Sequence, residues 1–140
     1  MIGLGGNARR GVLFAAGLAL AVLPAHALAP ADLSDLAALK KLERGRWEIV
    51  DLDRGRHHHN VCLGDPLQLV QVEHRGPACT RETVKADAGS VTVQYSCAGH
   101  GFGHTRVRVE TPRLARINTQ GLIDGRPFSW RGEARRTGAC

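Results

Sequence analysis

The sequence lacks the short motifs that mark the common classes of enzyme. It contains no H-E-x-x-H pair, and none of its serines lies in a nucleophile elbow. Gly99, Gly101 and Gly103 have the spacing of a phosphate-binding loop but not its context. A phosphate-binding loop lies between a strand and a helix, whereas these glycines join two expected strands. A tight turn with positive φ angles is the better interpretation. We predict a non-enzymatic protein without a cofactor, although a site assembled from distant residues would leave no such motif.

An apolar run long enough to cross a bilayer is also lacking. The N-terminal apolar run covers 11–23, which is shorter than the ~20 residues that a spanning helix needs. It follows Arg9 and Arg10 and precedes a small-residue triplet ending at Ala27, the order found in a secretory signal. No cysteine follows the triplet, so a lipid anchor is not indicated. We predict a signal peptide over 1–27 with cleavage after Ala27, and a periplasmic or secreted protein without a stable membrane anchor; an uncleaved anchor helix is the weaker alternative.

The four cysteines lack the close pairs that a zinc site uses. The 113 residues after the signal suffice for one domain with a modest core. An even number of cysteines behind a signal peptide predicts two disulfides, each worth ~3–4 kcal/mol in the chain-entropy model. Three pairings are open. We favour Cys62 with Cys79, which flank a local excursion of the chain, and Cys97 with Cys140, which would tie the chain end to a strand.

Basic residues are not gathered into one block. The formal charge of +6 falls to about +4 without Arg9 and Arg10, from 17 basic and 13 acidic side chains. Outside the cytoplasm this balance favours an anionic surface over nucleic acid as a partner, and plain solubility is the simpler interpretation. We therefore predict no nucleic-acid partner and retain an envelope protein or an anionic surface as the partner class.

Periodicity divides the remaining chain into a helical segment and a series of strands. Leucines at helical spacing predict an amphipathic helix within the segment 28–44, ending at Gly45. In 45–140 apolar and polar residues alternate, most clearly over 91–97 and 128–135, as in half-buried strands.

Turn residues separate these strands. Asp53-Arg54-Gly55 and Asp124-Gly125 predict hairpin turns, and Asp65-Pro66 predicts the start of a short helix. We predict a mainly β fold: a curved antiparallel sheet or small partly open β-barrel of meander connectivity, disulfide-bonded over 45–140, with the N-terminal helix on one side.

Histidines are the one group that suggests metal chemistry. On a regular strand His57 and His59 would point the same way and could chelate a divalent metal, with His100 and His104 as further ligands. Against this, His57 and His59 share their expected face with apolar residues, and a convincing site needs three or four convergent ligands. Divalent metal binding is therefore an alternative function.

Several landmarks together resemble an exported bacterial family, catalogued as domain of unknown function 3617. They are the signal peptide, Gly45-x-Trp47-Glu48, Cys62-Leu63 before a short helical start, Cys79, Cys97 followed by glycines, and the terminal Gly138-x-Cys140. The resemblance implies a periplasmic or secreted β-rich protein of unestablished activity, with no catalytic residues to transfer. The segment between Glu48 and Cys62, which is longer in that family, is short here.

A second resemblance gives an alternative function. Tyr95-x-Cys97-x-x-His100 is similar to the tyrosine-cysteine strand of periplasmic inhibitors of C-type lysozyme, but the serine-glycine loop of those inhibitors is missing. Our main prediction is a non-enzymatic binding or protective module of the cell envelope. An inhibitor of a cell-wall lytic enzyme is retained as the minor alternative.

Overall fold

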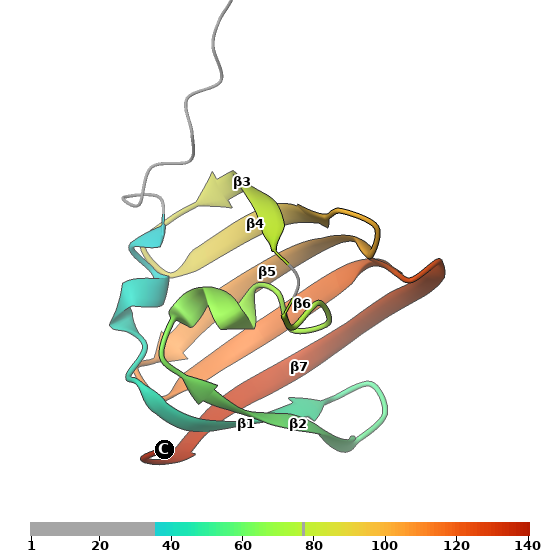
Figure 1. The fold of residues 1–140 in the computed structure, drawn as a ribbon. Helices are drawn as coiled ribbons and strands as arrows, with labels where there is room; N and C mark the ends of the chain where they lie inside the picture. Colours follow the sequence, from blue (N-terminus) through green and yellow to red (C-terminus); the bar gives the residue numbers. More distant parts are fainter. Residues whose placement is uncertain (1–35, 77) are drawn as a thin grey trace, which may run out of the picture.

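A single curved antiparallel sheet forms the body of the molecule (Figure 1). The computed structural model describes residues 36–76 and 78–140. The elements are η2 (Leu39–Lys41), β1 (Gly45–Asp51), β2 (Arg56–Leu63), η3 (Pro66–Leu69), β3 (Cys79–Ala86), β4 (Ser90–Cys97), β5 (Gly101–Thr111), β6 (Leu114–Ile123) and β7 (Arg126–Gly138). The strand order is β2-β1-β7-β6-β5-β4-β3, so β2 and β3 are the edges and the sheet does not close. The mainly β, curved-sheet prediction is confirmed.

The N-terminal predictions fall largely outside this description. The predicted signal peptide over 1–27 lies outside the described residues, as does most of the helix expected within 28–44. The described end of that segment forms the short 3-10 helix η2, which buries Leu39. Within 36–76 and 78–140, no helix is long and apolar enough to cross a membrane.

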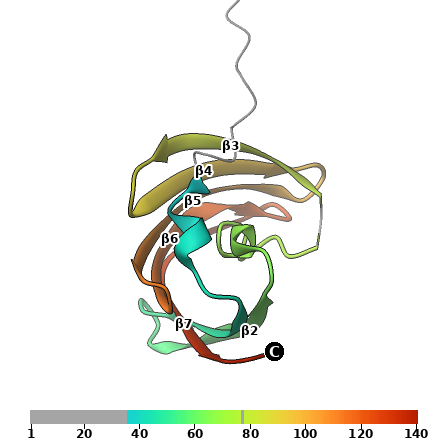
Figure 2. The same cartoon turned by 90° about the vertical axis from the view of Figure 1, so that its left-hand side faces the viewer.

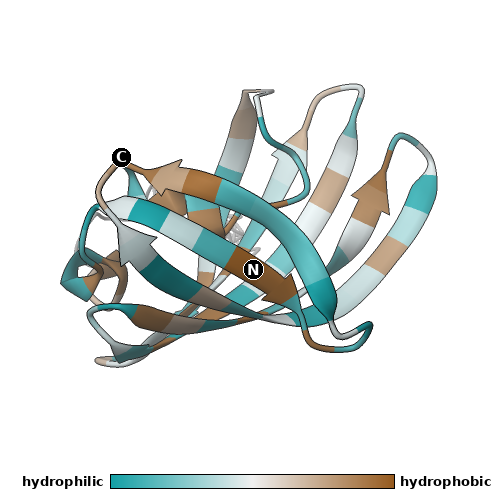
Figure 3. Cartoon of the chain, turned by 90° about the horizontal axis from the view of Figure 1, so that it is seen from below, coloured by the Kyte–Doolittle hydropathy of each residue, from teal (hydrophilic) through white to brown (hydrophobic). Residues whose placement is uncertain are grey.

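The core lies on the concave side of the sheet. Alternate residues of β1 and of β4 to β7 point inward. The helices η2 and η3 lie within the curve (Figure 2), and the strands show bands of differing hydropathy (Figure 3). The largest buried side chains include Trp47, Tyr95, Leu39, Ile49, Leu63, Leu69 and Ile117. An antiparallel sheet with one apolar face needs such a cover, and the two short helices supply part of it.

The hairpin between β1 and β2 is held by a buried carboxylate. Asp51 accepts hydrogen bonds from the backbone N–H groups of Asp53 and Arg54, at 2.9 and 3.0 Å, and from the Arg54 side chain at 2.8 Å. Burial alone would raise the pKa of Asp51, but these bonds outweigh it and the pKa is lowered. The turn predicted at Asp53-Arg54-Gly55 is therefore fixed by the residue just before it, and Asp53 also binds Arg131 of β7 at 2.6 Å.

Both edge strands are interrupted by a bulge. The pairing of β1 with β2 skips His58, and the pairing of β3 with β4 skips Val84. A bulge kinks an edge strand and disrupts its row of free backbone groups, which opposes pairing with another chain. The open sheet is thus protected at both edges.

Two disulfides are present as predicted, but the predicted pairing is wrong. Cys79 is bonded to Cys97, its direct cross-strand partner in the β3–β4 hairpin, with Cα atoms 4.2 Å apart. Cys62 is bonded to Cys140, because β2 and the end of β7 both flank Arg46 of β1. Strand order, which sequence spacing does not reveal, decides which cysteines meet.

Candidate functional site

The strongest candidate site is a cleft at the open seam of the sheet. The chain from 64 to 78 connects edge strand β2 to edge strand β3 and therefore crosses the side on which the sheet fails to close. Its η3 helix is fixed by a capping box in which Asp65 accepts from Leu67 N and Gln68 reaches back to Asp65 N. The cleft has a volume of about 290 Å³ and is lined by His59, Val61, Asp65, Leu67, Gln68, Gln71, His74, Arg75, Gly76 and Arg81.

His74 forms the inner end of this cleft. The side chain is almost fully buried, with its Nε2 atom 3.1 Å from the carbonyl oxygen of His100 and its Nδ1 atom 3.1 Å from the Tyr95 hydroxyl. A carbonyl only accepts, so Nε2 carries the proton, and in the neutral ring Nδ1 accepts from Tyr95. Both ring nitrogens are therefore occupied by the protein itself.

The polar chain continues beneath the cleft into the sheet. The Tyr95 hydroxyl bonds the side chain of Thr105, which lies 2.7 Å from the Thr119 hydroxyl. Since Tyr95 donates to His74, it accepts from Thr105, which in turn accepts from Thr119. Burial, followed by the charge of Glu73, raises the pKa of Tyr95 to about 12, so this hydroxyl stays protonated. A fully satisfied buried network of this kind rigidifies the floor of the site.

A glycine makes room for Tyr95. Gly103 is the cross-strand partner of Tyr95, and a Cβ atom at Gly103 would collide with the Tyr95 ring. Gly99 and Gly101, by contrast, have φ angles of 77° and 116° at the turn between β4 and β5. The prediction that these glycines serve a turn and not a nucleotide loop is confirmed for the first two, whereas the third has a steric role.

A second cluster of polar groups lies beside this network. One carboxylate oxygen of Glu73 accepts from Trp130 Nε1 at 2.6 Å and lies 3.0 Å from His58 Nε2. The His58 ring packs on Trp130 with centroids 4.5 Å apart. The side chains of His58 and Glu73 are partly exposed, at 23% and 18%, so this cluster reaches the surface.

The bulge in β2 explains why two consecutive histidines both lie in this region, His58 beside Glu73 and His59 in the lining of the cleft. Ile49, which faces the core, pairs with His59, whereas Val50 pairs with His57 and leaves His58 unpaired. The expectation that His57 and His59 point the same way is therefore wrong. His57 is exposed and lies 3.1 Å from the Asn60 side chain.

His59 is the predicted residue that the structure places in the cleft. Burial, followed by the positive charge of Arg75, lowers its pKa from 6.5 to about 4. At neutral pH its ring is uncharged and can donate and accept one hydrogen bond each. Arg75 and Arg81 supply the positive charge of the cleft, and Asp65, whose carboxylate accepts from Leu67 N at the start of η3, is the one acidic side chain among its described lining residues, so positive charge is in excess.

The four predicted metal ligands do not converge. His57 and His59 lie on β2, which is separated from the β5 strand of His104 by β1, β7 and β6. His100 lies at the β4–β5 turn, 3.3 Å from Asp124, and His104 lies between Gln94 and Gln120 on neighbouring strands. Within the described part of the chain, no group of three or more His, Cys, Asp or Glu side chains is placed to hold a metal ion.

Sequence reasoning missed Glu73 and His74, because apolar and polar residues follow no regular spacing in the segment that carries them. The available signal was a cluster of polar residues, Gln71, Glu73 and His74, in the connection between two cysteine-bearing strands.

Comparison with known proteins adds no assignment: no family model matches the chain, and neither the curated proteins nor the solved structures contain a significant match.

Proposed function

We propose that this chain is an exported binding protein that holds a small anionic ligand with an apolar tail in the seam cleft. The observation that carries the proposal is the composition of the cleft, in which Arg75 and Arg81 line the same space as the half-buried, uncharged His59. Export is supported by the predicted signal and by two disulfides, which persist in oxidising compartments.

The positive charge supports an anion. Arg81 donates from Nε and Nη2 to the side-chain oxygen of Gln71, at 3.1 and 2.6 Å, which fixes the plane of its guanidinium group. A guanidinium has five N–H donors, so a fixed Arg81 retains donors for a ligand carboxylate. Arg75 is exposed at the rim and adds attraction at longer range.

The size and the walls support a small ligand with an apolar tail. Val61 of β2 and Leu67 of η3 contribute apolar surface to the lining of the cleft. A volume of about 290 Å³ lies just below the range for ligand pockets, which is roughly 300–1,000 Å³. We therefore expect a ligand of the size of a medium-chain carboxylic acid.

The hydrogen bonding of the inner residues favours binding over catalysis. A general base must be able to reach a substrate proton, but both nitrogens of His74 are bonded to Tyr95 and to a carbonyl group. These bonds make His74 a rigid wall of the cleft.

Calorimetric titration of the chain from residue 28 onward tests the proposal. We expect saturable binding of hexanoate and at least about tenfold weaker binding of hexanamide, which has the same tail without the charge. Arg81→Gln and Arg75→Gln should each weaken hexanoate binding, and Arg126→Gln, at an exposed arginine outside the cleft, should not. Equal affinity for acid and amide, or no saturable heat with either, would refute the anion site.

The alternatives have less support. The resemblance to domain of unknown function 3617 remains a hypothesis, and it implies no ligand. The lysozyme-inhibitor resemblance depends on Tyr95, Cys97 and His100, of which Tyr95 and Cys97 are buried and only His100 is exposed. Unchanged lysis of a cell-wall substrate by lysozyme would remove that alternative, and zinc or copper titration without saturable heat would remove the metal alternative.

A further inference from the structure

The outer face of β5 carries a row of side chains with no role in the seam cleft. Residues that alternate with the buried Thr105 and Val107 point outward, namely Phe102, His104, Arg106 and Arg108. Six residues of extended strand place the ends of this row ~20 Å apart. The row runs from an exposed aromatic ring at one end to guanidinium groups at the other.

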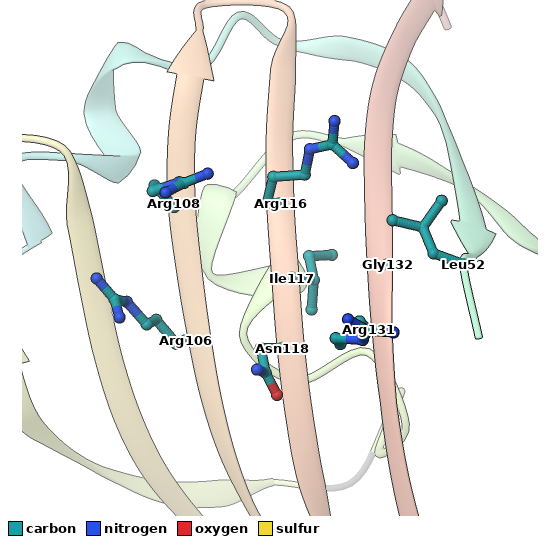
Figure 4. Close-up of a pocket in the computed structure, with 8 residues that line it drawn as sticks. All are labelled: Leu52, Arg106, Arg108, Arg116, Ile117, Asn118, Arg131 and Gly132. Carbon is teal, nitrogen blue, oxygen red and sulfur yellow. The ribbon is translucent and has the colours of Figure 1, made fainter.

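Two adjoining hollows follow this row. The first, of about 330 Å³, is lined by Arg106, Arg108, Arg116, Asn118 and Arg131, with Leu52 at its rim; Figure 4 shows these side chains around it. The second, of about 340 Å³, is lined by Thr92, His104, Arg106, Asn118 and Gln120. Because both share Arg106 and Asn118, they form one trough across β4 to β7, which we call the outer trough.

The arginine end of the outer trough has a charge pattern that favours an anion. Arg108 and Arg116 are direct cross-strand partners, and like charges in that position destabilise a sheet. Within the described residues, Arg106 forms no ion pair at contact distance: it donates to the Ser90 hydroxyl at 3.5 Å, and its charge helps to lower the pKa of Asp87. A bound anion would relieve both arrangements.

The other three arginines of the trough, Arg108, Arg116 and Arg131, are each paired with a carboxylate but remain exposed. Arg108 is bonded to Glu110 and Arg116 to Glu133, at 2.6 and 3.2 Å, while 59% and 44% of the two arginine side chains remain exposed. Exposed pairs of this type contribute only ~0–1 kcal/mol, so a multiply charged ligand can share or displace them.

The other end of the trough has the chemistry of a sugar site. Thr92, Gln120 and His104 offer hydroxyl, amide and imidazole groups, and among residues 36–76 and 78–140 nothing forms a hydrogen bond with the buried His104 Nε2. Phe102 is 47% exposed and provides an apolar ring at the end of the row. Hydroxyl and amide groups beside an exposed ring suit hydroxyl-bearing sugar units better than a lipid surface.

We propose that the outer trough binds a phosphorylated glycan chain, with phosphate groups on Arg106, Arg108 and Arg116, sugar units along His104 and Gln120, and a further sugar unit beyond the trough on Phe102. Guanidinium groups bind phosphate through paired N–H donors, and two opposed arginines match a group that carries more than one negative charge. The trough is separate from the seam cleft and does not depend on the ligand proposed there.

Fluorescence anisotropy with labelled phosphodextran tests this inference. We expect saturable binding that weakens with added salt, and at least about tenfold weaker binding of the Arg106→Gln/Arg108→Gln double variant. The matched control, Arg56→Gln/Arg126→Gln, removes two exposed arginines outside the trough and should change affinity less than about twofold.

Further variants and probes separate the two ends of the trough. Phe102→Ala should weaken phosphodextran binding about threefold, whereas Val84→Ala, at the exposed position on β3, should not. Polyglutamate, unmodified dextran and anionic vesicles should each bind at least about tenfold more weakly. Equal loss in the two double variants, or equal binding of polyglutamate or vesicles, would overturn the proposal, and unchanged unfolding midpoints establish that the variants are folded.

Discussion

Removing the two disulfides separately should destabilise the protein to different and calculable extents. Cys62 and Cys140 are 78 residues apart, and Cys79 and Cys97 are 18 apart. In the chain-entropy model, these loops correspond to about 4.5 and about 3.2 kcal/mol of stability. The Cys62→Ala/Cys140→Ala variant should therefore lose about 1 kcal/mol more than Cys79→Ala/Cys97→Ala.

Urea unfolding followed by tryptophan fluorescence measures both losses. Trp47 and Trp130 are buried, so their emission should shift to longer wavelength when the sheet opens. A greater loss for the short-loop variant would refute the assumption that the bridges act through the unfolded chain. Removing a bridge leaves the unfolded chain less compact and raises the slope against urea, so the free energies of unfolding are compared after extrapolation to zero urea.

Peptide mapping tests the pairing itself. Trypsin places the four cysteines in four peptides, 57–75, 76–81, 86–106 and 137–140. Without reduction, 57–75 should be linked to 137–140, and 76–81 to 86–106. A link between 57–75 and 76–81 would restore the pairing that sequence spacing favoured.

Three further predictions concern the seam cleft and its floor. Tyr95→Phe should cost ~1–3 kcal/mol, measured by urea unfolding, because it leaves buried partners unsatisfied; an unchanged midpoint would contradict the network. Gly103→Ala should cost ~1–3 kcal/mol by overpacking against the Tyr95 ring, whereas Gly64→Ala, with no neighbour near its Cβ position, should cost less than half as much. The free energy of unfolding should fall as the pH is lowered from 6.5 to about 4. In this range the unfolded chain binds a proton at His59, whose pKa is then 6.5, whereas the folded chain does not bind it until the pH reaches about 4. That drop has an upper bound of about 3 kcal/mol, reduced to about 1–2 by partial exposure; His59→Gln should abolish it and His57→Gln should not.

The strands were predictable because burial imposes a strict period. On β4, the side chains of Val91, Val93, Tyr95 and Cys97 all face the core of the protein, as their alternation predicted. The short helix after Asp65 was predictable from a local capping signal. Each of these signals is formed by residues that are close together in the chain, so a single sequence is enough to find it.

The candidate site was predictable only in part, because it depends on irregular backbone. Three consecutive histidines give no sign of a bulge, yet the bulge at His58 decides that His59 enters the cleft and His57 does not. His74 meets Tyr95 and the His100 carbonyl across 21 and 26 residues of chain. Such contacts follow from strand order, and so did the disulfide pairing.

The central claim is that the open seam of the sheet is a ligand site for a small anion. Nuclear magnetic resonance mapping with hexanoate tests it most directly. The account predicts that the amide and side-chain signals of His59, Arg75 and Arg81 shift and saturate together, while those of Arg106 and Arg108 on the outer face do not. Shifts confined to the outer face, or none that saturate, would contradict it.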